Sequence, residues 1–151
     1  METPALTRAA LDRFVDEHAP FIPAMGITCE EIGRGHAVAR LRSDPRWMRP
    51  GNIVCGGMLM TRADVAIYFA ILGQVGFRAM AVTNELKMNF LRPAAGEDIL
   101  ARARVLKLGR RIAYGEIHVQ MANGTGNLIA HATSSYVLPS EEVGRPHREP
   151  S

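Results

Sequence analysis

The stretch Ile53–Leu72, IVCGGMLMTRADVAIYFAIL, decides the fold, because it predicts one long helix that must be buried. Its part Gly57–Leu72 is apolar nearly all round, whereas a surface helix would show a polar face. Gly73 and Gly76 are expected to end the helix. One acid, Asp64, lies within this apolar run. A carboxylate on a buried helix is costly unless it is paired, hydrogen-bonded or opened to water. Asp64 is therefore either a functional group or a partner in a structural ion pair or hydrogen bond.

The remaining sequence predicts one amphipathic N-terminal helix, Thr7–His18, and six antiparallel strands. Alternating residues predict a hairpin within residues 25–42 and strands at 81–91 and 99–108, and two turns lead into further strands at 112–121 and 128–138. The stretch SDPRWMRPGN (43–52) is expected to be a loop. One buried helix with six strands indicates an α+β architecture, in which an antiparallel sheet wraps around the helix. We expect a single domain over residues 1–139, followed by a flexible polar tail, residues 140–151.

Composition restricts the function classes. The 151 residues are 47% hydrophobic and 22% charged, which is typical of a soluble globular protein. The net charge of +3 is too small to indicate a nucleic-acid partner. The longest uninterrupted apolar run, Val65–Leu72, is shorter than the ~20 residues of a membrane span, so no membrane partner is expected. Cys29 and Cys55 show no paired spacing, which favours a reducing cytoplasm. The five histidines show no metal-ligand spacing, so neither a metal nor a cofactor is expected.

Gly56 and Gly57 lie at the start of the buried helix. A helix N-terminus presents unpaired N–H groups with a partial positive charge, which can polarise a carbonyl and stabilise an oxyanion. A tight turn or close packing would also explain the two glycines. Thr61 and Tyr68 share the helical face of Asp64 and are further candidates.

Distance sets a condition on this site. Gly56 and Asp64 are eight residues apart, about 12 Å along a helix. An oxyanion donor must lie ~3 Å from the carbonyl oxygen, and a base must reach the attacked carbon directly or through one water. One chain therefore cannot readily present both groups to the same carbonyl. If both act, two antiparallel copies of the helix must lie side by side in an isologous dimer.

Two motifs, IVCGGMLMTRADVAIY (53–68) and VTNELKMNFLRPAAGEDILARARVLKLGRRIAYGEI (82–117), resemble the hotdog-fold acyl-CoA thioesterases of the phenylacetate-pathway (PaaI-like) branch. The resemblance extends from about Met25 to Pro139. It implies a hotdog fold and hydrolysis of an acyl-CoA thioester. It also implies that Asp64 is the general base or nucleophile, that the Gly56 N–H of the other subunit polarises the thioester carbonyl, and that Thr83 helps to hold the attacking water. A homodimer would be the minimum active unit, and a homotetramer is expected.

The chain departs from the family pattern at two places. Cys55 takes the place of the family's histidine before the two glycines, and no histidine nearby in sequence would activate it as a nucleophile. Asn52 is the only nearby asparagine, whereas the family's asparagine lies further upstream. Asn52 is therefore a weak catalytic candidate, and Cys55 and Gly57 are kept as substrate-binding candidates.

Further candidates concern the two ends of the substrate. Met58 and Tyr68 could line an acyl pocket or belong to the core. Lys107, Arg110 and Arg111 lie at an expected hairpin, where they could bind the phosphates of coenzyme A or form a solvated surface.

Two other functions remain open. The chain could bind acyl-CoA without turning it over, as a sensor or carrier, and the cysteine at position 55 gives this alternative some weight. A hotdog dehydratase is disfavoured, because those enzymes pair an acid with a histidine that is lacking at the helix start. Within the thioesterase hypothesis, activation of water and direct attack by Asp64 are equally open.

Overall fold

The computed structural model describes residues 3–78, 80–124 and 126–140. Its helices are α1 (Arg8–His18), α2 (Phe21–Ala24) and α3 (Gly56–Val75), with one 3-10 turn, η1 (Pro45–Trp47). Its strands are β1 (Ile27–Gly33), β2 (His36–Leu41), β3 (Met48–Arg49), β4 (Ile53–Val54), β5 (Val82–Phe90), β6 (Ile99–Leu108), β7 (Ile112–Met121) and β8 (Leu128–Val137).

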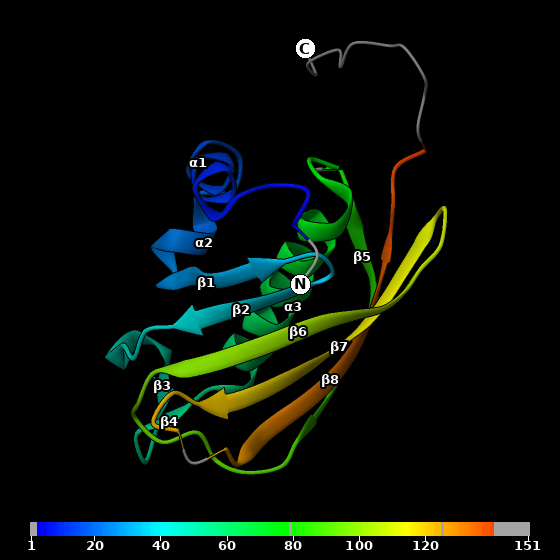
Figure 1. Cartoon of the computed structure of the whole chain (residues 1–151). Coiled ribbons are helices and arrows are strands. Elements are labelled where there is room, and N and C mark those ends of the chain that lie inside the picture. The colour runs from blue at the N-terminus through cyan, green and yellow to red at the C-terminus, as the bar shows by residue number, and fades with distance from the viewer. Residues whose placement is uncertain (1–2, 79, 125, 141–151) are drawn as a thin grey trace.

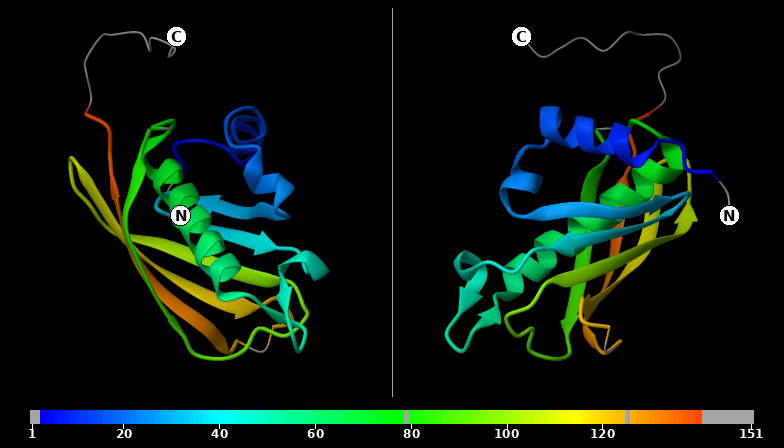
Figure 2. Two further views of the ribbon diagram at one scale, coloured as in Figure 1. Left: turned by 180° about the vertical axis from the view of Figure 1, so that it is seen from behind. Right: turned by 60° about the vertical axis from the view of Figure 1, so that its left-hand side comes forward.

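Six strands form one antiparallel sheet in the order β1-β2-β6-β7-β8-β5. The sheet curves around α3, which crosses one of its faces (Figures 1 and 2). Small residues on that face, such as Ala101 and Ala103 of β6, are fully or almost fully buried and let the helix approach closely. The prediction of a hotdog fold, an antiparallel sheet around one long helix, is confirmed.

The helix α3 is long and apolar enough to cross a membrane by length and composition alone. However, 67% of the most apolar 18-residue stretch of this helix is buried inside the chain's own fold. Side chains such as Phe69, Ile71 and Leu72 contribute to one core cluster with the sheet. The helix is therefore packed as the core helix of a globular domain.

The expected end of α3 at Gly73 is wrong. Gly73 lies inside the helix, where a Cβ atom would collide with the backbone carbonyl of Gly33 on β1. A glycine is needed there because helix and strand approach each other closely. The helix ends instead at Gly76, whose φ of 77° suits a glycine cap.

The loop expected over residues 43–52 contains ordered elements. It holds η1, followed by β3, and the turn after β3 leads into β4, which pairs antiparallel with it. Strands of two residues are too short to produce an alternation that the sequence could reveal. Of the expected tail, residues 141–151 lie outside the described residues.

The two edges of the sheet differ. At one edge α1 and α2 pack against β1 (Figure 1). At the other edge β5 pairs with β8 on one side only, and most of its side chains are exposed. Val82 and Phe90, at its two ends, are 55% and 53% exposed. An open edge strand that carries exposed apolar residues is a surface suited to pairing with another chain.

Candidate active site

Three elements meet at the carboxylate of Asp64. The Tyr136 hydroxyl, from β8, donates to Asp64 Oδ1 at 2.5 Å, and the Thr83 hydroxyl, from β5, donates to the same oxygen at 2.8 Å. The Tyr136 hydroxyl also lies 3.1 Å from the backbone carbonyl oxygen of Asp64. Because both hydroxyls bind Oδ1, they leave Oδ2 available for another partner.

Asp64 lines a cavity of about 310 Å³. Its walls come from the segment around α2, from α3, and from the strands on which Thr83 and Tyr136 lie. The lining residues are Ala19, Phe21, Ile22, Asp64, Val65, Tyr68, Ala81, Val82, Thr83 and Tyr136. Among the described residues that line it, Asp64 is the one carboxylate and none has an imidazole or a thiol, so a metal ion would find a single strong ligand there.

The two tyrosines of the cavity are held as neutral phenols. Burial raises the pKa of Tyr136, and the negative charge of Asp64 raises it further. Burial also raises the pKa of Tyr68, whose ring stacks on that of Tyr136 with centroids 6.1 Å apart. Tyr136 is therefore protonated at neutral pH and acts as a hydrogen-bond donor to Asp64.

The N-terminus of α3 forms a second polar feature. Cys55 is the N-cap residue in an extended conformation, and its side chain makes no capping hydrogen bond. Gly56 and Gly57 are the first helical residues, where N–H groups lack intrahelical partners. A Cβ atom on Gly56 would lie 3.3 Å from the ring of Phe90, whereas nothing lies within 4 Å of one on Gly57. This end of the helix therefore adjoins the far end of β5.

The structure brings together some of the expected site residues and separates others. Asp64, Thr83 and Tyr68 meet at the cavity, whereas Gly56 lies eight residues, about 12 Å, further along α3. Thr61 donates from its hydroxyl to the Gly57 carbonyl at 3.0 Å, inside the helix.

Other candidates lie outside the cavity. Met58 is 7% exposed and belongs to the core cluster. Asn52 occupies the turn between β3 and β4 with a φ of 58°, and its amide packs against Gly96. It does not line the cavity, so its catalytic role stays a prediction.

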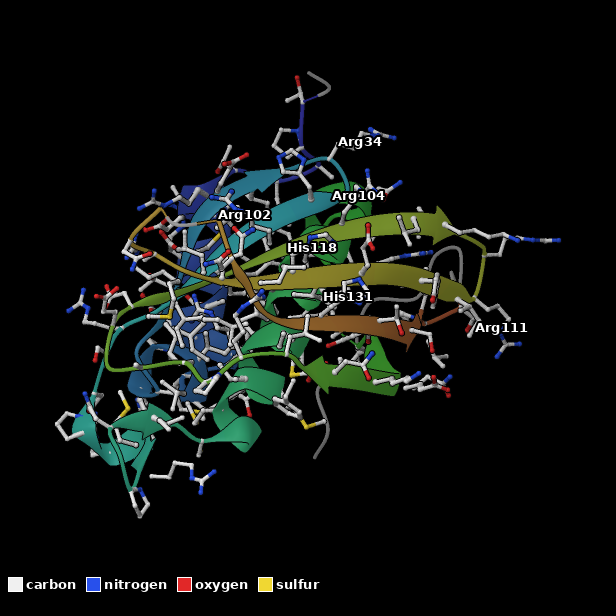
Figure 3. All side chains as sticks on the ribbon, turned by 90° about the horizontal axis from the view of Figure 1, so that it is seen from below. Arg34, Arg102, Arg104, Arg111, His118 and His131 are labelled. Carbon is white, nitrogen blue, oxygen red and sulfur yellow. The ribbon has the colours of Figure 1, made fainter. Side chains whose placement is uncertain are left out.

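Lys107, Arg110 and Arg111 are exposed around the turn between β6 and β7, and Figure 3 shows Arg111 at the end of the sheet. The turn lies at the same end of the sheet as the cavity, because Ala113 pairs with Tyr136 and the Arg111 carbonyl accepts from the Leu138 N–H at 2.7 Å. The three cations therefore lie at the end of the sheet that also holds Tyr136.

Tyr136 is the site residue that the sequence did not reveal. It lies 72 positions from Asp64 and occurs in a strand whose alternation is explained by packing alone. Only the pairing of β8 with β5, which matches Tyr136 with Thr83, brings the phenol to the carboxylate.

Comparisons with known proteins concern the sequence and the fold as a whole. The sequence model described as the Thioesterase superfamily matches residues 51–127. The chain is 27% identical to the medium/long-chain acyl-CoA thioesterase YigI of Escherichia coli over 138 residues, which cover 80% of this chain and 86% of YigI. A proposed thioesterase from Silicibacter sp. TM1040 is 31% identical, with a TM-score of 0.81 over 90% of this chain and 94% of that one.

The chain is also similar to a mutant of the phenylacetic acid degradation protein PaaI from Thermus thermophilus. The two are 26% identical with a TM-score of 0.70, over 80% of this chain and 99% of PaaI. The resemblance read from the two sequence motifs is confirmed.

Proposed function

This chain belongs to the Thioesterase superfamily, and from that premise we propose that it hydrolyses an acyl-CoA thioester to a carboxylic acid and free coenzyme A. The observation that carries the proposal is the Asp64 carboxylate, oriented by Thr83 and Tyr136 at a largely apolar cavity. Membership of the superfamily supports thioester hydrolysis in general. The acyl-CoA substrate is supported by the E. coli relative.

Asp64 acts through Oδ2 in the proposed reaction, because Oδ1 accepts the two hydroxyl hydrogen bonds. Oδ2 removes a proton from water, and the hydroxide attacks the thioester carbonyl carbon. The carbon–sulfur bond then breaks, and the leaving thiolate takes the proton back from Asp64. In the alternative route Oδ2 attacks the carbon itself and expels the thiolate, and water cleaves the resulting mixed anhydride.

The Gly56 N–H of a second protomer stabilises the oxyanion in this proposal. The edge strand β5 supports such an arrangement, because Thr83 near its start binds Asp64 and Phe90 at its end adjoins Gly56. If two β5 strands pair antiparallel about an axis between Leu86 and Lys87, Thr83 lies opposite the partner's Phe90. The Asp64 of one protomer and the Gly56 of its twin then approach each other.

The substrate would meet two chemical environments. The apolar wall of the cavity suits an acyl chain, and its volume of about 310 Å³ suits a small or medium-sized group. Lys107, Arg110 and Arg111 would bind the phosphates of coenzyme A at the β6–β7 turn. Two free cysteines are consistent with the cytoplasm as the proposed location, and a homotetramer of two such dimers is part of the proposal.

Substitution of Asp64 tests the chemistry. Asp64→Asn keeps the side-chain shape but removes the charge, so turnover of an acyl-CoA series should fall roughly 10²–10⁴-fold, measured with a thiol reagent. Retained turnover would refute the role of Asp64. If the wild type binds acyl-CoA without releasing coenzyme A, the chain is the sensor or carrier. A single turnover in heavy-oxygen water separates the two routes, since only the anhydride route leaves label in Asp64.

Mixing two inactive variants tests the shared site. Gly56→Pro removes the N–H at the first helical position, where proline is tolerated, and the Cys55 dihedrals (φ −65°, ψ 144°) suit a residue before proline. A mixed dimer of Asp64→Asn and Gly56→Pro chains retains one intact site. After subunit exchange, activity should return to about a quarter of the wild-type value if the dimers form at random. No recovery despite proven exchange would contradict a site shared between protomers.

A further inference from the structure

We propose that Glu116, His118 and His131 form a binding site for a divalent transition metal of the zinc type, on the face of the sheet that points away from α3. Glu116 and His118 lie two residues apart on β7, and His118 is paired with His131 on β8. Ile117 and Val119, which alternate with them, are fully buried on the other face. Figure 3 looks onto this outer face, with His118 and His131 beside each other.

The distances between the ligand atoms fit a single ion. Oε2 of Glu116 lies 3.2 Å from Nε2 of His131 and 3.6 Å from Nε2 of His118, and one ligand atom from each of the three residues lies within 4.8 Å of the other two. A tetrahedral zinc with bonds of 2.0–2.1 Å holds its ligands about 3.3 Å apart. Small side-chain rotations would therefore bring all three atoms into coordination.

The surrounding contacts orient the carboxylate for this role. Arg104 on β6 donates to the other carboxylate oxygen, Oε1, at 2.9 Å, which leaves Oε2 for the imidazoles or an ion. The His118 and His131 rings meet edge to face with centroids 5.1 Å apart. Both strands are interior strands of the sheet, so their backbones hold the spacing of the ligands. Hydrogen bonds to a ligand that fix its orientation are a regular part of metal sites.

Charge determines which metal the site would accept. Arg102 and Arg104 flank the cluster (Figure 3). Their positive charges weaken the binding of any cation that is held by electrostatic attraction alone. Two imidazoles favour copper, zinc and nickel, whereas magnesium and calcium prefer oxygen ligands. The site should therefore select a transition metal and leave positions open for water.

Titration calorimetry of protein stripped with a chelator tests the site. The wild type should bind one Zn²⁺ per chain at this cluster and should bind no Mg²⁺ there. His118→Ala, His131→Ala and Glu116→Gln should each weaken that binding at least about tenfold. Glu116→Gln keeps the shape and the acceptor for Arg104, so it guards against a change in fold, which circular dichroism checks.

Two control variants separate this cluster from other ligands. His36 Nε2 lies 3.0 Å from Glu31 Oε1, but this pair offers two ligands where the cluster offers three. His36→Ala should therefore bind Zn²⁺ as the wild type does. Cys55→Ser should also leave binding unchanged, because Cys55 lies at the helix start. The proposal would be overturned if the wild type did not bind Zn²⁺, or if all three cluster variants bound it with the wild-type affinity. Loss of Zn²⁺ binding in Cys55→Ser would also overturn it. Asp64→Asn should still bind Zn²⁺, so this test is independent of the proposed hydrolysis.

Discussion

The hydroxyl of Tyr136 donates to Oδ1 of Asp64 at 2.5 Å, although the two residues lie 72 positions apart. The same hydroxyl lies 3.1 Å from the Asp64 backbone carbonyl oxygen, so it contacts both the side chain and the helix that carries it. Burial and the charge of Asp64 raise the pKa of this phenol, which keeps the proton on Tyr136. The carboxylate is thus held in one orientation by a donor from the opposite layer of the fold.

Tyr136→Phe should lower thioester hydrolysis roughly ten- to a hundredfold, because a hydrogen bond to a charged group contributes about 1.5–3 kcal/mol. The packing of the ring against Tyr68 is retained, so the fold should persist. Steady-state kinetics measure the effect. Tyr114→Phe is the matched control, since Tyr114 is 42% exposed on β7, and its activity should equal the wild-type value. Equal loss in both variants would show that the orientation of Asp64 is unimportant.

The strands were more predictable than the contacts at the site. The bounds of β6 and β7 agree with the predicted strands, because one face of each is buried over most of its length, although a bulge between Val105 and Lys107 interrupts the alternation of β6. Asp64 was recognisable as a single acid in an apolar helix. Tyr136 was not, because its contact depends on the register of β8 with β5, and register is a long-range property.

Gly73 and Arg62 show the limits of local patterns in α3. Gly73 was expected to end the helix, but it is a contact point with β1. Arg62 lies two residues from Asp64, so it points away from that carboxylate, and it is fully buried. Nothing in the spacing of residues indicates that a guanidinium will be covered by the sheet, since that depends on how the two layers meet.

The glycines at the start of α3 should respond differently to alanine. Gly57→Ala meets no atom within 4 Å and reduces the freedom of the unfolded chain, so the free energy of unfolding should rise by about 0.5 kcal/mol. Gly56→Ala presses its Cβ against the ring of Phe90 at 3.3 Å, so it should gain less stability and lose more activity. Chemical denaturation and kinetics on both variants test this. Identical behaviour of the pair would contradict the close contact between Gly56 and Phe90.

Arg62 offers a test of buried charge. Its Nη2 donates to the carbonyls of Ala39 and Ile99, while its Nε and Nη1 have no partner among the described residues. Burial strongly lowers its pKa, which reflects the unfavourable surroundings of the charge. Arg62→Met fills a similar volume without a charge and should raise the free energy of unfolding by about 1 kcal/mol. Arg62→Ala should lower it by about 2–4 kcal/mol, because a cavity remains.

Chemical denaturation of both Arg62 variants gives the comparison. A fall of more than about 2 kcal/mol in Arg62→Met would show that the two carbonyl hydrogen bonds outweigh the burial of the guanidinium.

Asp98 should make stability depend on pH in the acidic range. The Ser43 N–H donates to it at 2.7 Å and Arg40 at 3.0 Å, and these hydrogen bonds lower its pKa. The unfolded pKa is about 3.9, so the stabilisation is complete above that pH and is lost as pH falls through the lower folded value. The free energy of unfolding of Asp98→Asn should therefore be about 1 kcal/mol lower than that of the wild type at pH 7, a figure that allows for screening by solvent at this partly exposed site. The difference should vanish near pH 2.

Denaturation curves at several pH values measure this difference. Asp16→Asn, at an exposed position of α1, serves as the control and should differ little from the wild type at any pH. A difference between wild type and Asp98→Asn that stays constant down to pH 2 would contradict the ion pair.

The two cysteines should react at very different rates. Cys29 is 4% exposed, and burial raises its pKa to about 12, so it remains a thiol at neutral pH. Cys55 is only partly buried at the start of α3. An alkylating reagent at pH 8 should modify Cys55 first, and mass spectrometry should find Cys29 modified only after denaturation. Labelling of native Cys55→Ser would show that Cys29 is accessible.

The exposure of β5 carries a consequence for how this protein tolerates change. Side chains that face solvent usually accept substitution with little effect on folding. Along Val82–Phe90, however, Thr83 positions the reactive carboxylate and Phe90 bounds the other end of the helix. In a saturation library, substitutions along this strand should therefore reduce activity more than the exposure of its side chains in the single chain indicates. Solvent accessibility would then be a misleading guide to which of its positions natural drift can alter.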